Sequence, residues 1–250
     1  MRILVINPNI SECVTALIAA EARRAASPGT VIVPATAPFG VAYIETESEA
    51  AIGGYAAMIL YAEHGADCDA VVIAAFGDPG LPAVREIARV PVVGIAEAAF
   101  AAAGELGTRF SIVAISQRIA AWYRRCAQLN EVDGNLASIR TLTGPIGDIG
   151  AVQEEQEAAL LSLCTRIIDQ DEAEVIVMAG APLAGIGRRI ADRLPIPLVD
   201  GVTSGVRLAE ARVRAGAQSS EAGGHAPPPE KPHKGLPAAL AALVGRLRTC

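Results

Sequence analysis

Two carboxylates in this sequence stand beside predicted strands or helices, where either could transfer a proton to a bound molecule. Asp78 lies in the turn FGDPG, directly after the continuous apolar run 70–74, and Glu45 follows the apolar Ile44 ahead of a long Ala-rich stretch. A carboxylate within hydrogen-bond reach of a ligand can serve as a general acid or base. Ordinary turn chemistry at Asp78 and a helix first turn at Glu45 explain the same residues, so both interpretations stay open.

Amide and hydroxyl side chains mark two further turns and could bind polar groups of a ligand. Asn7 and Asn9 flank Pro8 after the apolar run RILVI, and Ser116 follows the run RFSIVAI. Both runs are typical of buried strands, and open α/β sheets bind ligands beyond the carboxyl ends of their strands. An Asx-type turn at the two asparagines and a helix N-cap at Ser116 are the alternatives without a ligand.

Other chemistries find little support in the sequence. The cysteines are scattered without a Cys-x-x-Cys pair, which indicates free thiols rather than disulfides or a zinc site. The histidines form no metal-ligand pattern, so no bound metal is expected. A GxSxG elbow, a GxGxxG fingerprint and a P-loop are all missing from the sequence.

Composition limits the class of protein. Hydrophobic residues make up 52% of the 250 residues and aromatic residues only 4%, which suits a tightly packed α/β enzyme. The net charge is −6 and no basic cluster occurs, which argues against nucleic acid or an anionic membrane as a partner. A small-molecule substrate is expected instead. Without a leader-like segment or a long apolar run, the protein is expected to be cytoplasmic.

Apolar runs alternate with Ala-rich or amphipathic stretches, which predicts strands alternating with helices. Strands are expected at 2–6, 30–33, 69–74, 90–94, 109–115, 136–141, 173–178 and 196–199. Helices are expected at 11–24, 47–65, 82–88, 97–106, 120–129, 152–169 and 200–214. One more helix is expected after the second Gly/Pro turn, ending at residue 193.

The two halves of the sequence resemble each other. DAVVIAAFGDPGLPAVREIARVPVVGIAEA matches AEVIVMAGAPLAGIGRRIADRLPIPLVDGV in its buried strand, Gly/Pro turn, basic helix and proline-started second strand. Such a repeat predicts an α/β fold of two pseudo-symmetric lobes, each a parallel sheet flanked by helices. Lobe one is expected to comprise 1–95 plus 201–250, and lobe two 96–200. Within lobe one, the Pro-rich stretch 215–235 is expected to be a tether, and 236–247 a helix that docks back on the lobe.

Several motifs together resemble the hydantoin racemases of the aspartate/glutamate racemase superfamily. They are RILVINPN, the Ile44-Glu45 pair, AFGDPGL, PVVGIAEAA, RFSIV and PIPLVDGV. The resemblance covers essentially the whole chain, including the late segment GLPAAL. It implies a ligand cleft between the two lobes, a homo-oligomer, and a cofactor-independent isomerase that acts on the acidic carbon beside a carbonyl.

The sequence departs from this family at the residues that move protons. The resemblance implies one cysteine in each lobe, acting as thiolate and thiol on opposite faces of the substrate. These cysteines fall on Ala75 and Gly180, which carry no titratable side chain. We interpret the chain as a natural thiol-free branch, with the alternative that the first position was engineered.

The resemblance and the strand ends together define a set of candidate residues. Asp78 and Glu45 are the candidate bases. The candidate substrate-binding residues are Asn7, Asn9, Ile44, Ala75, Phe76, Gly77, Ser116, Gly180, Ala181 and Pro182. Backbone amides of the two Gly-rich turns are expected to stabilise an enolate oxygen.

Three functional interpretations follow. The first is a hydantoin racemase-type enzyme that passes through an enolate-like intermediate, with carboxylates in place of thiols. The second is a lyase or hydrolase on the same scaffold, which decarboxylates a hydantoin-like ring or removes a ring substituent. The third is a non-catalytic protein that binds the same ligands.

Overall fold

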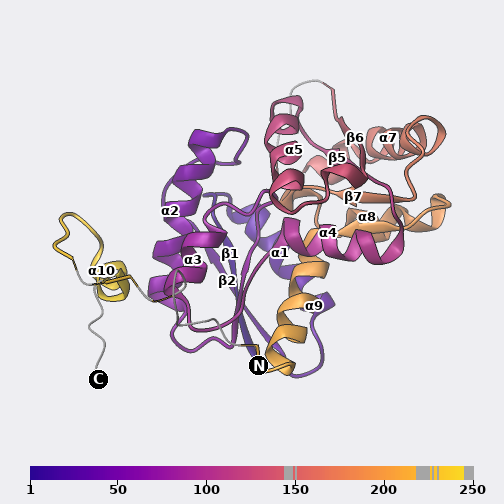
Figure 1. Cartoon of the computed structure of the whole chain (residues 1–250). Coiled ribbons are helices and arrows are strands. Elements are labelled where there is room, and N and C mark those ends of the chain that lie inside the picture. Colours follow the sequence, from indigo (N-terminus) through magenta and orange to yellow (C-terminus); the bar gives the residue numbers. More distant parts are fainter. Residues whose placement is uncertain (144–148, 150, 218–225, 227, 230, 245–250) are drawn as a thin grey trace.

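Two parallel four-stranded sheets form the framework of the protein. The computed structural model describes all residues except 144–148, 150, 218–225, 227, 230 and 245–250. The first sheet has the order β2-β1-β3-β4 and the second β6-β5-β7-β8, so the same topology occurs twice (Figure 1). The predicted α/β fold of two similar lobes is confirmed.

The elements follow one another in regular alternation, as parallel strands require a crossover between them. The strands are β1 (Arg2–Asn7), β2 (Val31–Thr36), β3 (Ala70–Ile73), β4 (Val92–Gly94), β5 (Phe110–Ala114), β6 (Leu136–Thr141), β7 (Val175–Met178) and β8 (Leu198–Asp200). The α-helices are α1 (Glu12–Ala25), α2 (Glu47–His64), α3 (Leu81–Ile87), α4 (Ile95–Leu106), α5 (Ala120–Leu129), α6 (Val152–Glu155), α7 (Glu157–Gln170), α8 (Ile186–Ile190), α9 (Gly201–Arg214) and α10 (Ala238–Val244). Short 3-10 helices include η1 (Gln117–Ile119) and η3 (Ala181–Leu183).

The strand register places the two Gly-rich turns at equivalent ends. In the first sheet Ile6 of β1 is paired with Ile73 of β3, and in the second Val113 of β5 is paired with Met178 of β7. The segments that follow these four strand positions therefore emerge at the carboxyl edge of each sheet. This is where parallel sheets bind ligands.

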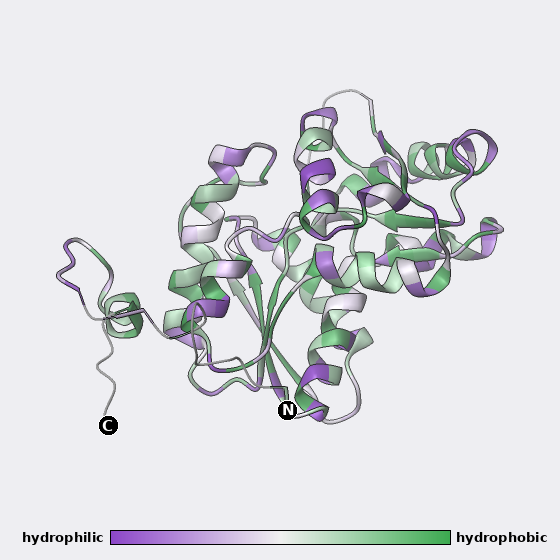
Figure 2. Ribbon diagram, viewed as in Figure 1, coloured by the Kyte–Doolittle hydropathy of each residue, from purple (hydrophilic) through white to green (hydrophobic). Residues whose placement is uncertain are grey.

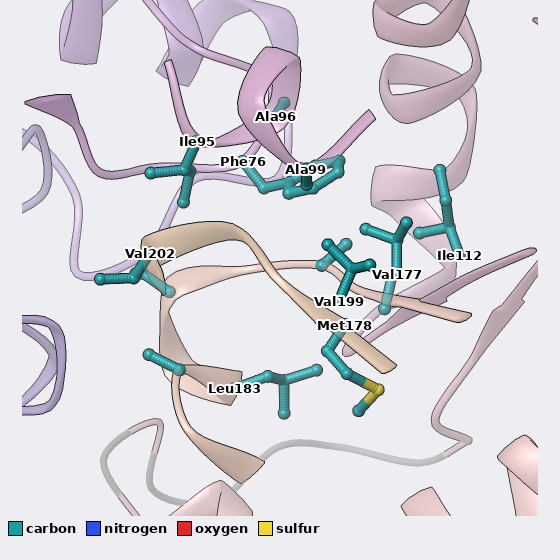
Figure 3. Close-up of a cluster of buried hydrophobic side chains, with 14 of the residues drawn as sticks. Phe76, Ile95, Ala96, Ala99, Ile112, Val177, Met178, Leu183, Val199 and Val202 are labelled. Carbon is teal, nitrogen blue, oxygen red and sulfur yellow. The ribbon is translucent and has the colours of Figure 1, made fainter. Parts of the chain in front are cut away.

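A single apolar cluster extends from one sheet to the other. Figure 3 shows Ile95 and Ala99 of α4 above Val177 of β7 and Val199 of β8, and all four side chains are buried. In Figure 2 the strands are green and the purple residues lie mainly on the outward faces of helices. Because α4 contacts both β4 and β7, the core itself fixes the lobes against each other.

Two expectations need correction. The expected single helix 152–169 is broken at Gln156 into α6 and α7. The Gln153 side chain donates hydrogen bonds to the carbonyls of Pro182 and Ala184, so α6 stays beside η3 while α7 packs on β5 and β6.

The C-terminal helix α10 begins at Ala238 rather than at residue 236 and packs against α2 with Leu240 buried, and residues 245–247 of the expected helix lie outside the described residues. The same holds for much of the expected tether, namely 218–225, 227 and 230. In the part of the chain that the structure describes, no helix is both long and apolar enough to cross a membrane.

Candidate functional site

One cavity is lined by residues from both halves of the chain. The room it leaves for the centre of a water molecule is about 30 Å³, which is more than one buried water requires. Its lining consists of Asn9, Tyr43, Ile44, Ala75, Phe76, Ile115, Ile119, Tyr123, Gly180, Ala181 and Pro182. Within the described residues, this wall has amide and phenol groups but no carboxylate, thiol or imidazole.

Ala75 and Gly180 both line this cavity, each at the end of the third strand of its sheet. Gly180 has φ +111°, a conformation that side-chain-bearing residues rarely adopt. The backbone N–H groups of Phe76, Gly77, Gly180 and Ala181 have no hydrogen-bond partner among the described residues. Each turn therefore has free donors at the carboxyl edge of its sheet.

Asn9 presents an amide donor whose orientation is fixed by its neighbours. Its Oδ1 accepts hydrogen bonds from Asn7 Nδ2 at 3.0 Å and from the Ser11 N–H at 2.9 Å. The Asn9 Nδ2 has no partner among the described residues, although the residue is only 4% exposed and lines the cavity. Since the oxygen is already committed, the NH₂ group is the part of Asn9 that remains for a ligand.

Asn7 lies behind this wall. It is fully buried, and its Nδ2 also donates to Thr15 Oγ1 at 2.9 Å and to the carbonyl of Ser11 at 3.2 Å. Asn7 does not line the cavity, so its contribution is to orient Asn9.

Two tyrosines outside the set of candidate residues, Tyr43 and Tyr123, belong to the cavity wall. Tyr123 is 3% exposed, and burial raises the pKa of its phenol well above the ordinary value. Burial and the nearby carboxylate of Glu45 likewise raise the pKa of Tyr43. Both phenols are therefore protonated at neutral pH and can donate hydrogen bonds. The helical spacing of Ile119 and Tyr123, four residues apart, is the sequence signal that could have placed both on one face.

Asp78 is directed away from the cavity. Its carboxylate accepts hydrogen bonds from the N–H groups of Ala96 and Glu97, both at 2.9 Å, at the start of α4. Burial raises the pKa of Asp78 to about 7, although these two donors favour the charged form. Asp78 therefore caps the N-terminus of α4, although Ala96, whose N–H it accepts, lies 18 residues further along the sequence.

Glu45 and Ser116 lie beside the cavity without lining it. Glu45 lines an adjoining hollow together with Arg118 and Trp122. Ser116 Oγ accepts a hydrogen bond from the Arg118 N–H at 3.3 Å and caps the 3-10 helix η1. Of the candidate residues, the structure brings together around the cavity Asn9, Ile44, Ala75, Phe76, Gly180, Ala181 and Pro182, and leaves out Asn7, Glu45, Gly77, Asp78 and Ser116.

No metal centre is evident in the described part of the chain, where no three His, Cys, Asp or Glu side chains are grouped to hold an ion. The described cysteines are free thiols, and all except Cys13 are buried.

Two parallel sheets with a cavity between their carboxyl edges define a two-lobed α/β protein of the kind that binds a small molecule between its lobes. The family can be named from the sequence. The chain belongs to the Asp/Glu/hydantoin racemase family, whose model matches residues 3–209. The expected family is confirmed, and with it the class of enzyme, an isomerase of the racemase type.

The relatives cover nearly the whole chain. The hydantoin racemase of Paenarthrobacter aurescens is 36% identical over 236 residues, which are 92% of this chain and 99% of that protein. The allantoin racemase of Klebsiella pneumoniae is 33% identical, with a TM-score of 0.91 over 96% of this chain and 98% of that one. The allantoin racemase of Pseudomonas fluorescens is 34% identical, with a TM-score of 0.87 over 94% and 100%.

Proposed function

We propose that this protein binds a hydantoin-like molecule in the cavity between its lobes and exchanges the proton on the carbon beside a ring carbonyl. The observation that carries this proposal is the position of Ala75 and Gly180, which come from equivalent strand ends and line the same cavity. The family relationship supplies the class of substrate, because the similar proteins are named hydantoin and allantoin racemases.

The donors around the cavity suit the oxygen atoms of such a ring. A hydantoin has two carbonyl oxygens, and loss of the proton beside one of them places negative charge on that oxygen. The Asn9 amide and the free N–H groups of the two turns can donate to these oxygens. Donors that are already oriented in a site with little water stabilise such an enolate strongly.

Proton removal must proceed without thiols. Neither Ala75 nor Gly180 can accept a proton, and Asp78 is committed to the N-terminus of α4. Glu45 is the remaining candidate base, and its carboxylate lies near enough to Tyr43 to raise that phenol's pKa. We assign Tyr43 as the relay: its oxygen takes the proton from the ligand carbon while its own proton passes to Glu45.

Hydrogen exchange in D₂O tests this proposal. Enantiopure 5-benzylhydantoin and allantoin are incubated with the protein, and the ring C–H is followed by proton NMR while optical activity is followed by circular dichroism. Solvent deuterium should enter the ring, and optical activity should decay. Glu45→Gln and Tyr43→Phe should slow exchange about 100-fold or more, whereas Tyr55→Phe, on an exposed face of α2, should not. Binding of both compounds without exchange would refute the proposal and leave a ligand-binding protein.

A lyase is the second candidate, and one observation favours it. The described wall of the cavity has donors but no carboxylate, thiol or imidazole. A substrate that loses carbon dioxide generates its own carbanion, so it requires only enolate stabilisation and a proton donor. Release of carbon dioxide from a 5-carboxylated hydantoin, without exchange on 5-benzylhydantoin, would select this reaction over racemisation.

A further inference from the structure

The hydroxyl of Tyr123 lies beside the place where Gly180 lacks a side chain. A Cβ atom built on Gly180 would lie 3.7 Å from the Tyr123 hydroxyl oxygen, with no closer contact to the surrounding residues. Tyr123 is provided by α5 of lobe two, and Gly180 by the turn after β7 of the same lobe. The phenol oxygen therefore occupies the neighbourhood that a side chain at residue 180 would reach.

This hydroxyl is unpartnered although its residue is buried. Tyr123 is 3% exposed, lines the cavity, and makes no hydrogen bond through its oxygen to any described residue. Among the described residues no fully buried side-chain nitrogen or oxygen lacks a partner, so the oxygen of Tyr123 is open to the cavity. A ligand oxygen or carbon acid in the cavity would give it a partner.

The ring of Tyr123 is held in place from both lobes. Its centroid is 4.7 Å from that of Phe76 of lobe one and 5.8 Å from that of Trp122. The Trp122 ring in turn lies against Gly77, where it would collide with an added Cβ atom. Because Phe76 belongs to the AFGDPG turn and Trp122 contacts it, the Tyr123 ring packs against the turn that carries Ala75.

We infer that the Tyr123 hydroxyl is the proton donor on the Gly180 side of the ligand. This inference rests on the proposed function and assigns the proton donor on the second face of the ligand. The reaction carbon gives its proton to Tyr43 and Glu45 on one face. Tyr123 then gives its hydroxyl proton to the opposite face, and a carbon–hydrogen bond forms as the oxygen–hydrogen bond breaks. The phenolate recovers a proton from water, and Glu45 releases its proton to water.

Two-sided proton transfer makes the two enantiomers unequal in a variant that lacks one side. In Tyr123→Phe, the enantiomer whose C–H faces Tyr43 should still exchange deuterium, because Tyr43 can remove and return the proton on that face. The rate at which its mirror image exchanges should be lower by a factor of about 100 or more. Racemisation, which needs both faces, should fall by the same factor.

The experiment measures exchange separately for (R)- and (S)-5-benzylhydantoin in D₂O by NMR, with binding followed by calorimetry. Tyr55→Phe is the matched control, since it also loses one phenol oxygen but lies on the exposed side of α2. Equal racemisation by Tyr123→Phe and the unmodified protein would overturn the inference alone. So would an equal fall for both enantiomers accompanied by lost binding, which would mark a packing role. An unmodified protein that binds 5-benzylhydantoin and exchanges neither enantiomer would instead overturn the proposed function and this inference with it.

Discussion

Asp78 and Asp200 connect equivalent elements in the two lobes, but from opposite ends. Asp78 sits in the turn after β3 and accepts hydrogen bonds from Ala96 and Glu97 at the start of α4. Asp200 ends β8, caps α9 through the Thr203 N–H, and accepts the Gly185 N–H from the turn after β7 at 2.7 Å. Each carboxylate therefore fixes a turn that carries one of the two facing positions of the cavity.

Asp78 is buried and Asp200 is half-buried, and burial raises the pKa of each carboxyl group. Neither residue lines the cavity, and their hydrogen bonds hold the turns. The repeat that is visible in the sequence thus extends to a shared way of fastening the turns to the following helices.

The pKa of Asp78 predicts a pH-dependent contribution to stability. In the folded protein the pKa of Asp78 is about 7, above the ordinary value of 3.8 for an aspartate. The folded protein therefore binds this proton more tightly, and the contribution is full below about pH 4 and is lost as the pH rises through 7. In Asp78→Asn, which does not titrate, this loss should disappear. The unfolding free energy of the unmodified protein minus that of the variant should therefore decrease from pH 4 to pH 8. Denaturant titration at each pH measures this difference.

A matched measurement isolates the group. Asp69→Asn, which removes an exposed carboxylate just before β3 that accepts the Arg2 N–H, is the matched control and is measured over the same interval. A difference for Asp78→Asn that stays constant or grows with pH would contradict a raised pKa at this residue.

Asn7 is predicted to affect ligand binding without touching the ligand. Asn7→Ala removes the donor that holds Asn9 Oδ1 and leaves Thr15 and the Ser11 carbonyl short of a partner. The variant should lose roughly 1–3 kcal/mol of unfolding free energy and bind hydantoins more weakly, because the Asn9 amide can rotate. Asn9→Ala should weaken binding with a smaller loss of stability. Thermal unfolding and calorimetry distinguish the two. Equal binding by Asn7→Ala and the unmodified protein would contradict the positioning role.

The sequence was sufficient for the framework of the cavity. Buried apolar runs such as 70–74 and 175–178 predict central parallel strands, and the internal repeat predicts that their ends are equivalent. Ala75 and Gly180 follow these strands directly, so their positions depend only on strand boundaries. Asn9 is likewise tied to the end of β1 by a two-residue turn.

The directions of side chains could not be obtained in the same way. Asp78 was a candidate base because it is the titratable group closest in sequence to Ala75. Where its carboxylate points depends on the N-terminus of α4, which only tertiary packing brings near. Tyr123 is a similar case, since an aromatic residue on an amphipathic helix can face the core or the cleft, and the rotation of α5 decides between them. The local sequence pattern does not determine how α5 is rotated about its axis.

Thiols placed at the two facing positions provide a direct test of the cavity geometry. A side chain at residue 180 has room, because its Cβ would lie 3.7 Å from both Pro182 Cδ and the Tyr123 oxygen. The φ of +111° there should nevertheless cost Gly180→Cys roughly 1–3 kcal/mol of unfolding free energy. Ala75→Cys should be tolerated better, since the residue already has a Cβ. The double cysteine variant should racemise 5-benzylhydantoin at least about tenfold faster than the double serine variant, whose hydroxyls are far poorer bases than thiolates. Its rate should rise with pH, because burial raises the pKa of an introduced thiol. If the cysteine and serine variants racemise equally, Ala75 and Gly180 do not face the same carbon of the ligand.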